Sequence, residues 1–321
     1  MSRYDRQMIL PQIGSAGQAR LGAAHVLIVG AGGLGASLIP ALAGAGVGRI
    51  AIVDDDLVEE SNLHRQTLFR MGDLGRPKAG CAAEAARGLN PEIRVDALAL
   101  HLDPDNLPPL LAGVDLVIDA ADSFAVSYML SDACGPRGVP LISASVLGRQ
   151  GYAGGFCGHA PGLRAVFPDL PETAASCATA GVMGPVVAML GAMQAQMALS
   201  VLLGLTPSPL GQIVNLDLAN WRCSGFRFDG AAEPEAQSQL RFIGRGQLMD
   251  ADCVIELRGT DEAPQPVTSR AMRIAPRAIG DWQPPAGQRV VLACRSGLRA
   301  WRAGRALQAR GVSDLALIAT G

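Results

Sequence analysis

The sequence predicts an α/β protein: a doubly wound, Rossmann-like, mostly parallel sheet, followed by a second, small α/β domain. Three observations lead to this fold class. Short apolar runs rich in β-branched residues alternate with helical patterns, a glycine-rich loop follows the first run, and a polar segment with proline precedes the last part of the chain. At roughly 100–200 residues per domain, a length of 321 residues also favours two domains.

The alternation of strands and helices can be followed along the first part of the chain. We expect strands at 25–30, 49–54, 93–98, 114–119 and 139–145, and helices at 33–46, 76–90 and 124–137. Residues 182–204 are apolar enough to cross a bilayer, but Gln194, Gln196 and Ser200 lie in their middle. We therefore expect a buried helix there and no membrane span.

The polar segment 229–239 has no periodicity and predicts a linker. Beyond it, strand patterns at 254–257 and 290–294 precede a helical pattern at 298–310. These patterns give the expected division: residues 1–228, a linker at 229–239, and a small α/β domain at 240–321.

The composition narrows the class of protein. Hydrophobic residues make up 49% of the chain and charged residues 17%, so a large core is expected and global disorder is excluded. A net charge of −2 argues against nucleic-acid binding. The first residues carry no secretory signal pattern and the seven cysteines form no CxxC pair, so we expect a cytoplasmic protein with free thiols.

A glycine loop predicts a nucleotide site. Gly30, Gly32 and Gly35 form G-x-G-x-x-G directly after a predicted strand and at the start of a predicted helix. Asp54 follows the next strand, at the distance where a carboxylate binds ribose hydroxyls. The loop alone does not show whether the nucleotide is NAD or ATP. A third interpretation is that the glycines only allow close packing of the helix on the strand.

The residues after Asp54 favour ATP. Asn62, Arg65 and Gln66 follow within one short segment, and Lys78, the only lysine among 27 basic residues, comes next. An enzyme that cleaves ATP needs such cations because negative charge builds up on the leaving pyrophosphate. A nicotinamide-dependent oxidoreductase has no need for them, so it is the weaker alternative.

Seven segments occur in an order that carries a family resemblance: RYDRQMIL, the glycine loop, DDDLVEESNLHRQ, GRPKA, NPEI, the Asp-x-x-Asp of IDAADS, and SCATAGVMGP. Over about residues 1–220 the chain resembles the ThiF/MoeB/HesA family, bacterial relatives of ubiquitin-activating enzymes. The resemblance implies ATP- and Mg²⁺-dependent adenylation of the C-terminal Gly-Gly carboxylate of a small ubiquitin-like sulfur-carrier protein.

The resemblance also implies roles for single residues. Gly33 would lie in the phosphate loop, Asp54 would bind the ribose, and Asp122 would bind Mg²⁺. The residues expected to hold the triphosphate are Asn62, Arg65, Gln66 and Lys78. Arg6 matches an arginine that family members lend to the partner subunit's ATP, which implies a homodimer. The alternatives are that Asp122 caps the following helix and that Arg6 is a solvated surface residue.

The chain departs from the family pattern at several positions. Ser123, Ser127 and Ser131 stand where relatives carry asparagine, arginine and asparagine. Many relatives hold zinc with two CxxC pairs, but Gly162 and Ala165 occupy the first pair and the second is missing. We therefore expect no structural zinc, and the spacing of Cys157, His159 and Cys223 supports an alternative zinc site poorly.

In the last part of the chain, VVLACRSGLRA resembles the active loop of rhodanese-like sulfurtransferases. Cys294 would carry a persulfide, with the backbone N–H groups of 295–299 and a helix N-terminus to stabilise it. The domain is short for this family, and an inert buried cysteine is the alternative reading. Cys177, before the long apolar helix, matches a cysteine that in some relatives joins the activated carrier.

The sequence thus predicts an adenylyltransferase joined to a sulfurtransferase, with Arg65, Lys78, Asp122, Cys177 and Cys294 as catalytic residues. The product would be a carrier thiocarboxylate for molybdopterin, thiamine or thiolated-tRNA synthesis. A persulfide donor such as a cysteine desulfurase would be a second partner. The serines and missing zinc ligands leave open a non-catalytic scaffold that binds the carrier.

Overall fold

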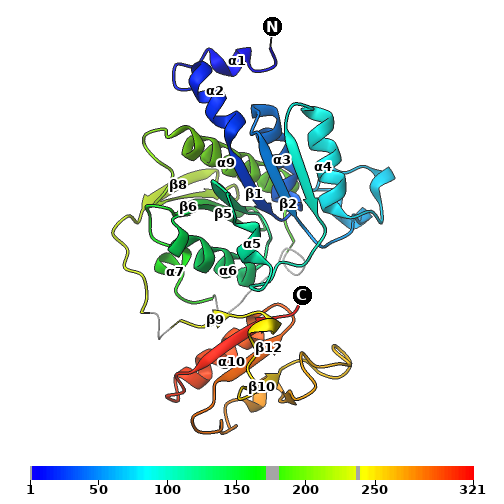
Figure 1. Ribbon diagram of the computed structural model, residues 1–321, viewed down its shortest axis with the longest axis vertical. Coiled ribbons are helices and arrows are strands. Elements are labelled where there is room, and N and C mark those ends of the chain that lie inside the picture. Colours follow the sequence, from blue (N-terminus) through cyan, green and yellow to red (C-terminus); the bar gives the residue numbers. More distant parts are fainter. Residues whose placement is uncertain (1, 171–180, 236–238) are drawn as a thin grey trace.

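The computed structural model describes residues 2–170, 181–235 and 239–321, which form two sheets (Figure 1). The first has the strand order β3-β2-β1-β4-β5-β6-β7-β8. Its strands are β1 (His25–Val29), β2 (Arg49–Val53), β3 (Arg94–Leu98), β4 (Leu116–Asp119), β5 (Pro140–Leu147), β6 (Gln150–Cys157), β7 (Gln212–Asp217) and β8 (Arg222–Arg227). From β3 to β5 the pairing is parallel, and from β5 to β8 it is antiparallel. The expected mostly parallel sheet is confirmed.

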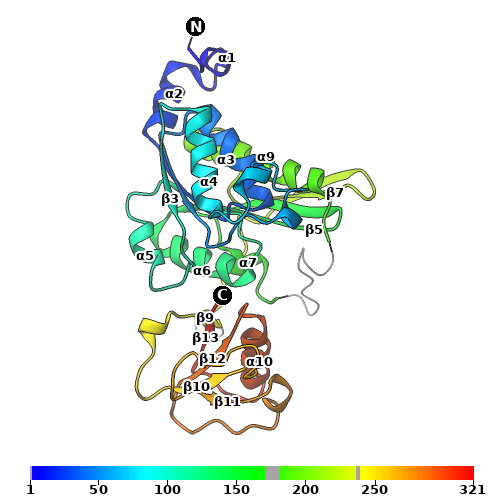
Figure 2. The ribbon, with the colours of Figure 1, turned by 90° about the vertical axis from the view of Figure 1, so that its right-hand side faces the viewer.

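Helices cover both faces of this sheet because the central strands are apolar on both sides. On one face, α3 (Gly33–Ala45), α4 (Lys78–Leu89) and α9 (Gly184–Leu203) pack on Val26 and Ile28. On the other face, α5 (Leu107–Leu110), α6 (Phe124–Cys134) and α7 (Leu163–Val166) form the layer seen in Figure 2. The remaining helices, α1 (Asp5–Met8) and α2 (Gly14–Ala23), lie at the end of the molecule opposite residues 240–321 (Figure 1).

The long apolar helix α9 belongs to the core. Half of its apolar window is buried, and it packs on α3 so closely that a Cβ at Gly191 would lie 2.4 Å from the Leu34 carbonyl oxygen. Gln194 is fully buried and donates from Nε2 to the Asp119 carbonyl oxygen at 2.6 Å. The expected buried helix is confirmed.

A second, five-stranded parallel sheet forms within residues 240–321, which we call the tail. Its order is β11-β10-β12-β13-β9, from β9 (Arg241–Phe242), β10 (Cys253–Glu256), β11 (Met272–Arg273), β12 (Val290–Cys294) and β13 (Leu315–Ala319). One longer helix, α10 (Leu298–Gln308), covers this sheet among the described residues. Short 3-10 helices lie at Glu60–Asn62, Met71–Asp73, Gly135–Arg137, Arg245–Gln247 and Pro276–Ala278.

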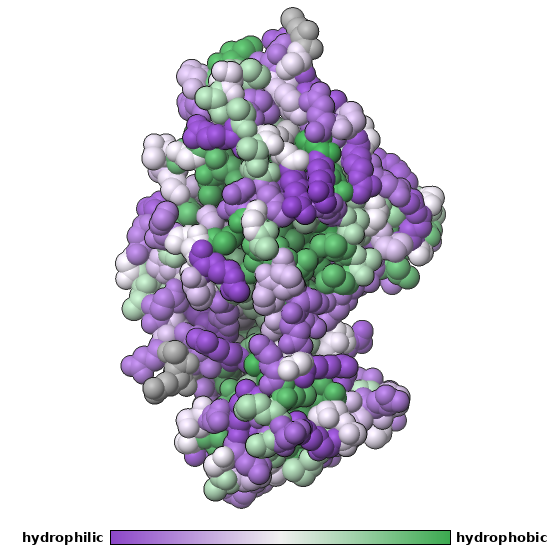
Figure 3. Space-filling model, viewed as in Figure 1, coloured by the Kyte–Doolittle hydropathy of each residue, from purple (hydrophilic) through white to green (hydrophobic). Residues whose placement is uncertain are grey.

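The tail packs against the α5–α6–α7 layer of the first sheet. Apolar residues of this layer, such as Tyr128 and Met129, form one continuous buried cluster with Trp301 and Phe242 of the tail. Figure 3 shows the result as one body that narrows where the two parts meet. The tail therefore has a defined position relative to the first sheet.

Candidate functional site

The glycine loop joins β1 to α3 at the carboxyl edge of the parallel strands. Gly30 has φ +100°, and a Cβ there would lie 2.3 Å from the Ala120 carbonyl oxygen. A Cβ at Gly35 would lie 2.6 Å from the Gly30 carbonyl oxygen. These approaches leave the first N–H groups of α3 facing out of the loop, which is the geometry that binds phosphate.

Asp54, directly after β2, holds this loop in place. Its carboxylate accepts hydrogen bonds from the backbone N–H of Ala31 at 2.7 Å and of Asp56 at 2.9 Å. Burial raises the pKa of Asp54, while these two bonds and the charge of Lys78 act in the opposite direction. The structure therefore gives Asp54 a role in the loop in addition to any contact with a ribose.

Lys78 begins α4 and lies almost entirely inside the protein, with 6% of its side chain exposed. Its Nζ donates to Asp56 Oδ2 at 2.7 Å, and Asp56 itself is exposed. Because a buried ammonium needs a partner, this ion pair fixes Lys78 beside Asp54 at the carboxyl edge of the sheet.

Arg65 and Gln66 lie over the glycine loop. A Cβ at Gly33 would meet the Arg65 Cγ at 3.5 Å, and a Cβ at Gly32 would meet the Gln66 Nε2 at 3.7 Å. Gln66 is buried, and its Oε1 has no hydrogen-bond partner among the described residues. Asn62 ends the short helix Glu60–Asn62, and its carbonyl oxygen accepts from the N–H groups of Arg65 and Gln66.

Asp122 lies in the turn between β4 and α6, with φ +49°, and is exposed. The buried Asp119 supports this turn by accepting from Ser127 Oγ at 2.6 Å and Ser143 Oγ at 2.7 Å. Burial raises the pKa of Asp119, and the two hydroxyl groups oppose that rise. The N-cap of α6 is Ser123, so Asp122 is not the helix cap that the sequence left open.

Together these residues fit a nucleotide. The loop offers free N–H groups, Lys78 and Arg65 offer cations, Gln66 offers an unsatisfied acceptor, and Asp122 offers a carboxylate oxygen of the kind Mg²⁺ prefers. No group of three or more His, Cys, Asp and Glu side chains lies together as a metal site in the described part of the chain. A metal there would need oxygens from its nucleotide as well, as Mg²⁺ normally has.

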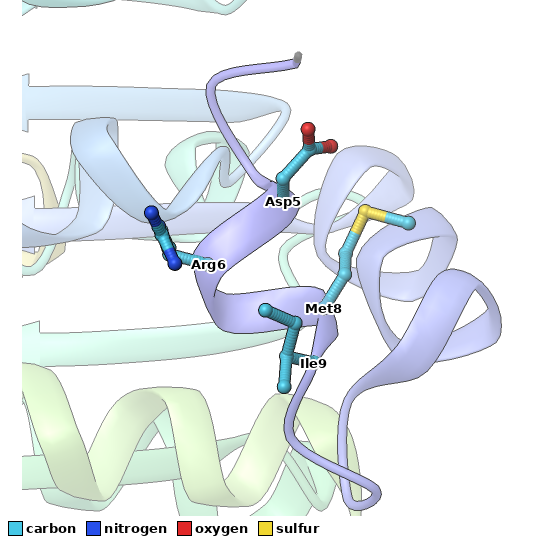
Figure 4. A pocket seen from close by; sticks show the side chains of 4 residues that line it. All are labelled: Asp5, Arg6, Met8 and Ile9. Carbon is cyan, nitrogen blue, oxygen red and sulfur yellow. The ribbon is translucent and has the colours of Figure 1, made fainter.

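Arg6 lies apart from this cluster. It is on α1, exposed, and Figure 4 shows it pointing away from Asp5 and Met8, on the other side of the helical turn. Asp5, Arg6, Met8 and Ile9 line a shallow hollow. Tyr4, just before Arg6, packs against Gly46 at the C-terminal end of α3, so this chain keeps α1 away from the glycine loop at the other end of α3.

Cys294 ends β12 and is fully buried. Its Sγ accepts a hydrogen bond from the backbone N–H of Ala300 at 3.3 Å, one residue beyond the amides expected from the sequence. Arg258 and Arg299 lie within electrostatic reach of the thiol. Cys177 lies outside the described residues.

Comparison with known proteins gives the family. The profile of the ThiF family matches residues 4–238, well over half of the chain. The chain belongs to the ThiF family. It is 42% identical over 227 residues to the sulfur carrier protein adenylyltransferase of Thermus thermophilus, covering 68% of this chain and 83% of that protein.

Other relatives of this ThiF-family chain include a SAMP-activating enzyme E1 of Haloferax volcanii, 42% identical over 63% of this chain and 76% of that protein. The adenylyltransferase and sulfurtransferase MOCS3 of Bos taurus is 43% identical over 70% of this chain and half of that protein. Escherichia coli MccB has a similar fold, with a TM-score of 0.64, 22% identity and 73% of both chains covered.

Two of the serines that we expected to differ from the family pattern, Ser127 and Ser131, have structural partners here. Ser127 bonds Asp119, as above, and Ser131 Oγ accepts from the backbone N–H of Leu163 at 2.9 Å. Ser131 also contacts the buried Cys157 thiol, whose pKa is raised by burial to about 12. The chain therefore keeps the α6 region ordered with different side chains.

The positions at which the resemblance implied zinc ligands in relatives make other contacts here. The backbone N–H of Gly162 donates to the Glu233 carboxylate. Ala165 lies within the short helix α7. Between them, Arg164 is buried and makes a bidentate ion pair with Asp132, at 2.6 and 2.8 Å. Cys157 is buried on β6 whereas Cys223 is exposed on β8, and the described residues provide no zinc ligand set there.

The sequence patterns assigned no role to three residues of the site. Asp56 pairs with Lys78, and Asp119 and Ser143 hold the turn that carries Asp122. Because Asp56 is the third of three consecutive aspartates, an ion pair between it and the only lysine could have been predicted from the sequence. Nothing local to Ser143 indicated its contact, because it depends on the pairing of β4 with β5.

Proposed function

We propose that this chain adenylates the C-terminal Gly-Gly carboxylate of a ubiquitin-like sulfur carrier, using ATP with Mg²⁺. The observation that carries the proposal is Lys78: the only lysine of the chain, buried at the carboxyl edge of the sheet beside Asp54 and the glycine loop. A buried cation at a phosphate-binding loop suits charge that develops on a departing pyrophosphate. The names of the relatives from Thermus thermophilus and Haloferax volcanii agree with this reaction.

In this proposal each residue has a defined task. The backbone N–H groups after Gly32 bind phosphate oxygens. Asp54 holds the glycine loop in place by accepting a hydrogen bond from the Ala31 N–H, and its carboxylate would also accept from the ribose hydroxyls. Lys78 and Arg65 hold the phosphate chain, and the side-chain amide N–H groups of Asn62 and Gln66 beside them would donate to it. Asp122 would hold Mg²⁺, whose charge would neutralise part of the charge on the phosphates.

We further propose that the tail is a rhodanese-like sulfurtransferase domain. Its support is the loop sequence around Cys294, the parallel five-stranded sheet, and the N–H of Ala300 directed at Sγ. A persulfide on Cys294 would attack the activated acyl carbon through its outer sulfur, and AMP would leave. A second thiol would attack the Cys294 sulfur of the resulting acyl disulfide, which frees the thiocarboxylate and leaves a disulfide for an external thiol to reduce. Cys177 is our candidate for a thiol that accepts the acyl group from the adenylate.

The proposal includes the assembly. Residues 1–228 would be the adenylyltransferase domain, 229–239 the linker and 240–321 the sulfurtransferase domain. Arg6 would serve the ATP of a second subunit in a homodimer, and a cysteine desulfurase is a suitable persulfide donor. The carrier thiocarboxylate would serve molybdopterin, thiamine or tRNA thiolation.

ATP–pyrophosphate exchange tests the adenylation step. With Mg²⁺ and a carrier ending in Gly-Gly, the wild-type chain should catalyse exchange, and Lys78→Met should lower it by roughly 100-fold or more, since one preorganised charge contributes about that much. Arg76→Ala removes a nearby surface arginine that pairs with Asp73 and Glu84, and should change exchange less than about twofold.

The controls separate binding from catalysis. A carrier that lacks its last two glycines should support no exchange with any variant. ATP binding without exchange, for every carrier, would favour the non-catalytic scaffold. Tight NAD binding without ATP binding would favour an oxidoreductase and reject the adenylation proposal.

A further inference from the structure

A hydrogen bond between two neighbouring side chains of the candidate site gives a role to His64. Arg65 Nη1 donates to His64 Nε2 at 2.9 Å. We propose that His64 is a positioning residue, which directs the Arg65 guanidinium toward the phosphate chain of the nucleotide. The inference rests on the proposed function, because it names the residue that directs one cation of the same site.

The chemistry of the two groups fixes the direction of this hydrogen bond. A guanidinium carries five N–H donors and no acceptor, so His64 Nε2 has to offer its lone pair. An imidazole that does so is neutral and carries its proton on Nδ1. His64 therefore holds one N–H of Arg65 without bringing a charge to the site.

A neutral partner leaves the charge of Arg65 available. The other cation of the site, Lys78, pairs with the Asp56 carboxylate at 2.7 Å, and the buried Arg164 pairs with Asp132. Arg65 makes no ion pair with any residue that the structure describes. Because a carboxylate competes with phosphate for a guanidinium, an imidazole is the partner that orients Arg65 and keeps it free to bind an anion.

The rest of Arg65 is fixed by the starts of two helices. A Cβ at Gly33, the first residue of α3, would lie 3.5 Å from Arg65 Cγ and 3.7 Å from its Cδ. A Cβ at Gly184, the first residue of α9, would lie 2.6 Å from the His64 carbonyl oxygen and 3.4 Å from Arg65 Cα. The backbone and the aliphatic stem are thus packed, and His64 adds the contact that directs the charged end.

This packing places Arg65 at the N-terminal end of α3. Its stem lies against Gly33, where the first N–H groups of the helix face out of the glycine loop. Those N–H groups and a guanidinium are donors for the same class of ligand, a phosphate chain. AMP lacks the two phosphates that leave as pyrophosphate, so loss of the His64 contact should weaken binding of ATP and spare binding of AMP.

Three variants of the full-length chain test the assignment. His64→Leu removes the acceptor, and His64→Gln restores one, because glutamine Oε1 can take the place of Nε2. His159→Leu is the matched control, since His159 is another exposed histidine, after the end of β6. Binding of ATP with Mg²⁺ and binding of AMP are measured for each variant by equilibrium dialysis.

We expect His64→Leu to weaken ATP binding about tenfold, the effect of losing a hydrogen bond to a charged group that is partly solvated. Its AMP affinity, and the ATP affinities of His64→Gln and His159→Leu, should stay within about twofold of wild type. His64 is exposed, so the variants should also keep the wild-type Tm.

Three results would overturn the assignment. The first is wild-type ATP affinity in His64→Leu, and the second is a His64→Gln chain as weak as His64→Leu. The third is an equal loss of ATP and AMP affinity, because His64 would then support the site as a whole and not the guanidinium.

The Arg65→Ala background tests the coupling of the two side chains. There, His64→Leu should change ATP binding less than about twofold, because the group that His64 positions is gone. Full additivity of the two substitutions would contradict a role that acts through Arg65.

Pyrophosphate exchange in the same preparations separates this inference from the proposed function. Normal exchange in wild type, with ATP binding that does not depend on His64, rejects the assignment and leaves adenylation standing. ATP binding that depends on His64 and on Arg65, without any exchange, supports the assignment and rejects adenylation.

Discussion

Gly35 shows how a single residue shapes the nucleotide loop. Its missing Cβ lets α3 approach the Gly30 carbonyl oxygen to a distance that no side chain tolerates, and the clash would be with backbone. Gly35→Ala should therefore destabilise the fold by about 1–3 kcal/mol, as overpacking of a tight site does. Chemical denaturation with a linear extrapolation measures the change.

Gly88→Ala is the matched control for this prediction. Gly88 also lies in a helix, on the exposed side of α4, where an added Cβ meets nothing within 4 Å. Removing a helical glycine there should stabilise the fold by up to about 1 kcal/mol. Equal effects of the two substitutions would contradict the packing account of the loop.

At the residue scale, the sequence indicated which side chains meet but not how they are held. Lys78, Arg65 and the glycines come together because each follows a strand of one parallel sheet, a rule that can be applied without coordinates. That Asp54 bonds Ala31, and that Asp119 takes two serine hydroxyls, depends on side-chain rotamers and strand register. Sequence patterns carry no information on either.

At the scale of elements, β10 is fixed by a buried ion pair. Glu256 is fully buried and accepts from Arg258 at 2.7 and 2.8 Å and from the Val267 N–H at 2.9 Å. Burial alone would raise the pKa of Glu256, but these bonds outweigh it and hold the pKa below its usual value. Removing one partner of such a pair typically costs about 3–5 kcal/mol.

The pH dependence follows from the direction of this shift. Because the pKa of Glu256 is lower in the folded chain than in the unfolded chain, its contribution is complete above the unfolded value and is lost as pH falls. Thermal unfolding of the wild type should therefore show a falling Tm below about pH 4.5. Glu256→Gln should lower Tm at pH 7 and flatten this dependence.

Asp250→Asn is the control for the Glu256 prediction. Asp250 pairs with Arg270 at the surface, and its side chain is fully exposed, so the substitution should leave both Tm and its pH profile nearly unchanged. A Glu256→Gln chain with a wild-type pH profile would contradict the role assigned to the buried pair.

Elements with strong patterns were predicted well and those without were missed. The β-branched runs of β1 and β2 and the apolar helices α3 and α9 lie within one or two residues of their predicted bounds. The antiparallel β6 to β8 were not predicted, because β6 is rich in glycine and β8 is exposed along its whole length. Their formation depends on pairing with β5, which tertiary structure provides.

For the whole molecule, the sequence indicated two parts and a linker but not their arrangement. The tail contacts Asp105 and Ala125, which lie in the segments after β3 and β4. The tail therefore lies near the edge of the first sheet where its parallel strands end. Trp301 and Arg164 give no sequence signal for this docking, although each is buried and contacts residues of the other part. Figures 1 and 2 show the resulting order from α1 through the first sheet to the tail.

The most direct test of the central claim is the intact mass of a Gly-Gly carrier after incubation with this chain, ATP, Mg²⁺ and a persulfide donor. We predict a carrier whose terminal carboxylate has exchanged one oxygen for sulfur in the wild-type reaction, and an AMP adduct without sulfur for Cys294→Ser. Lys78→Met should leave the carrier mass unchanged. An unmodified carrier in the wild-type reaction, with ATP bound, would contradict the account.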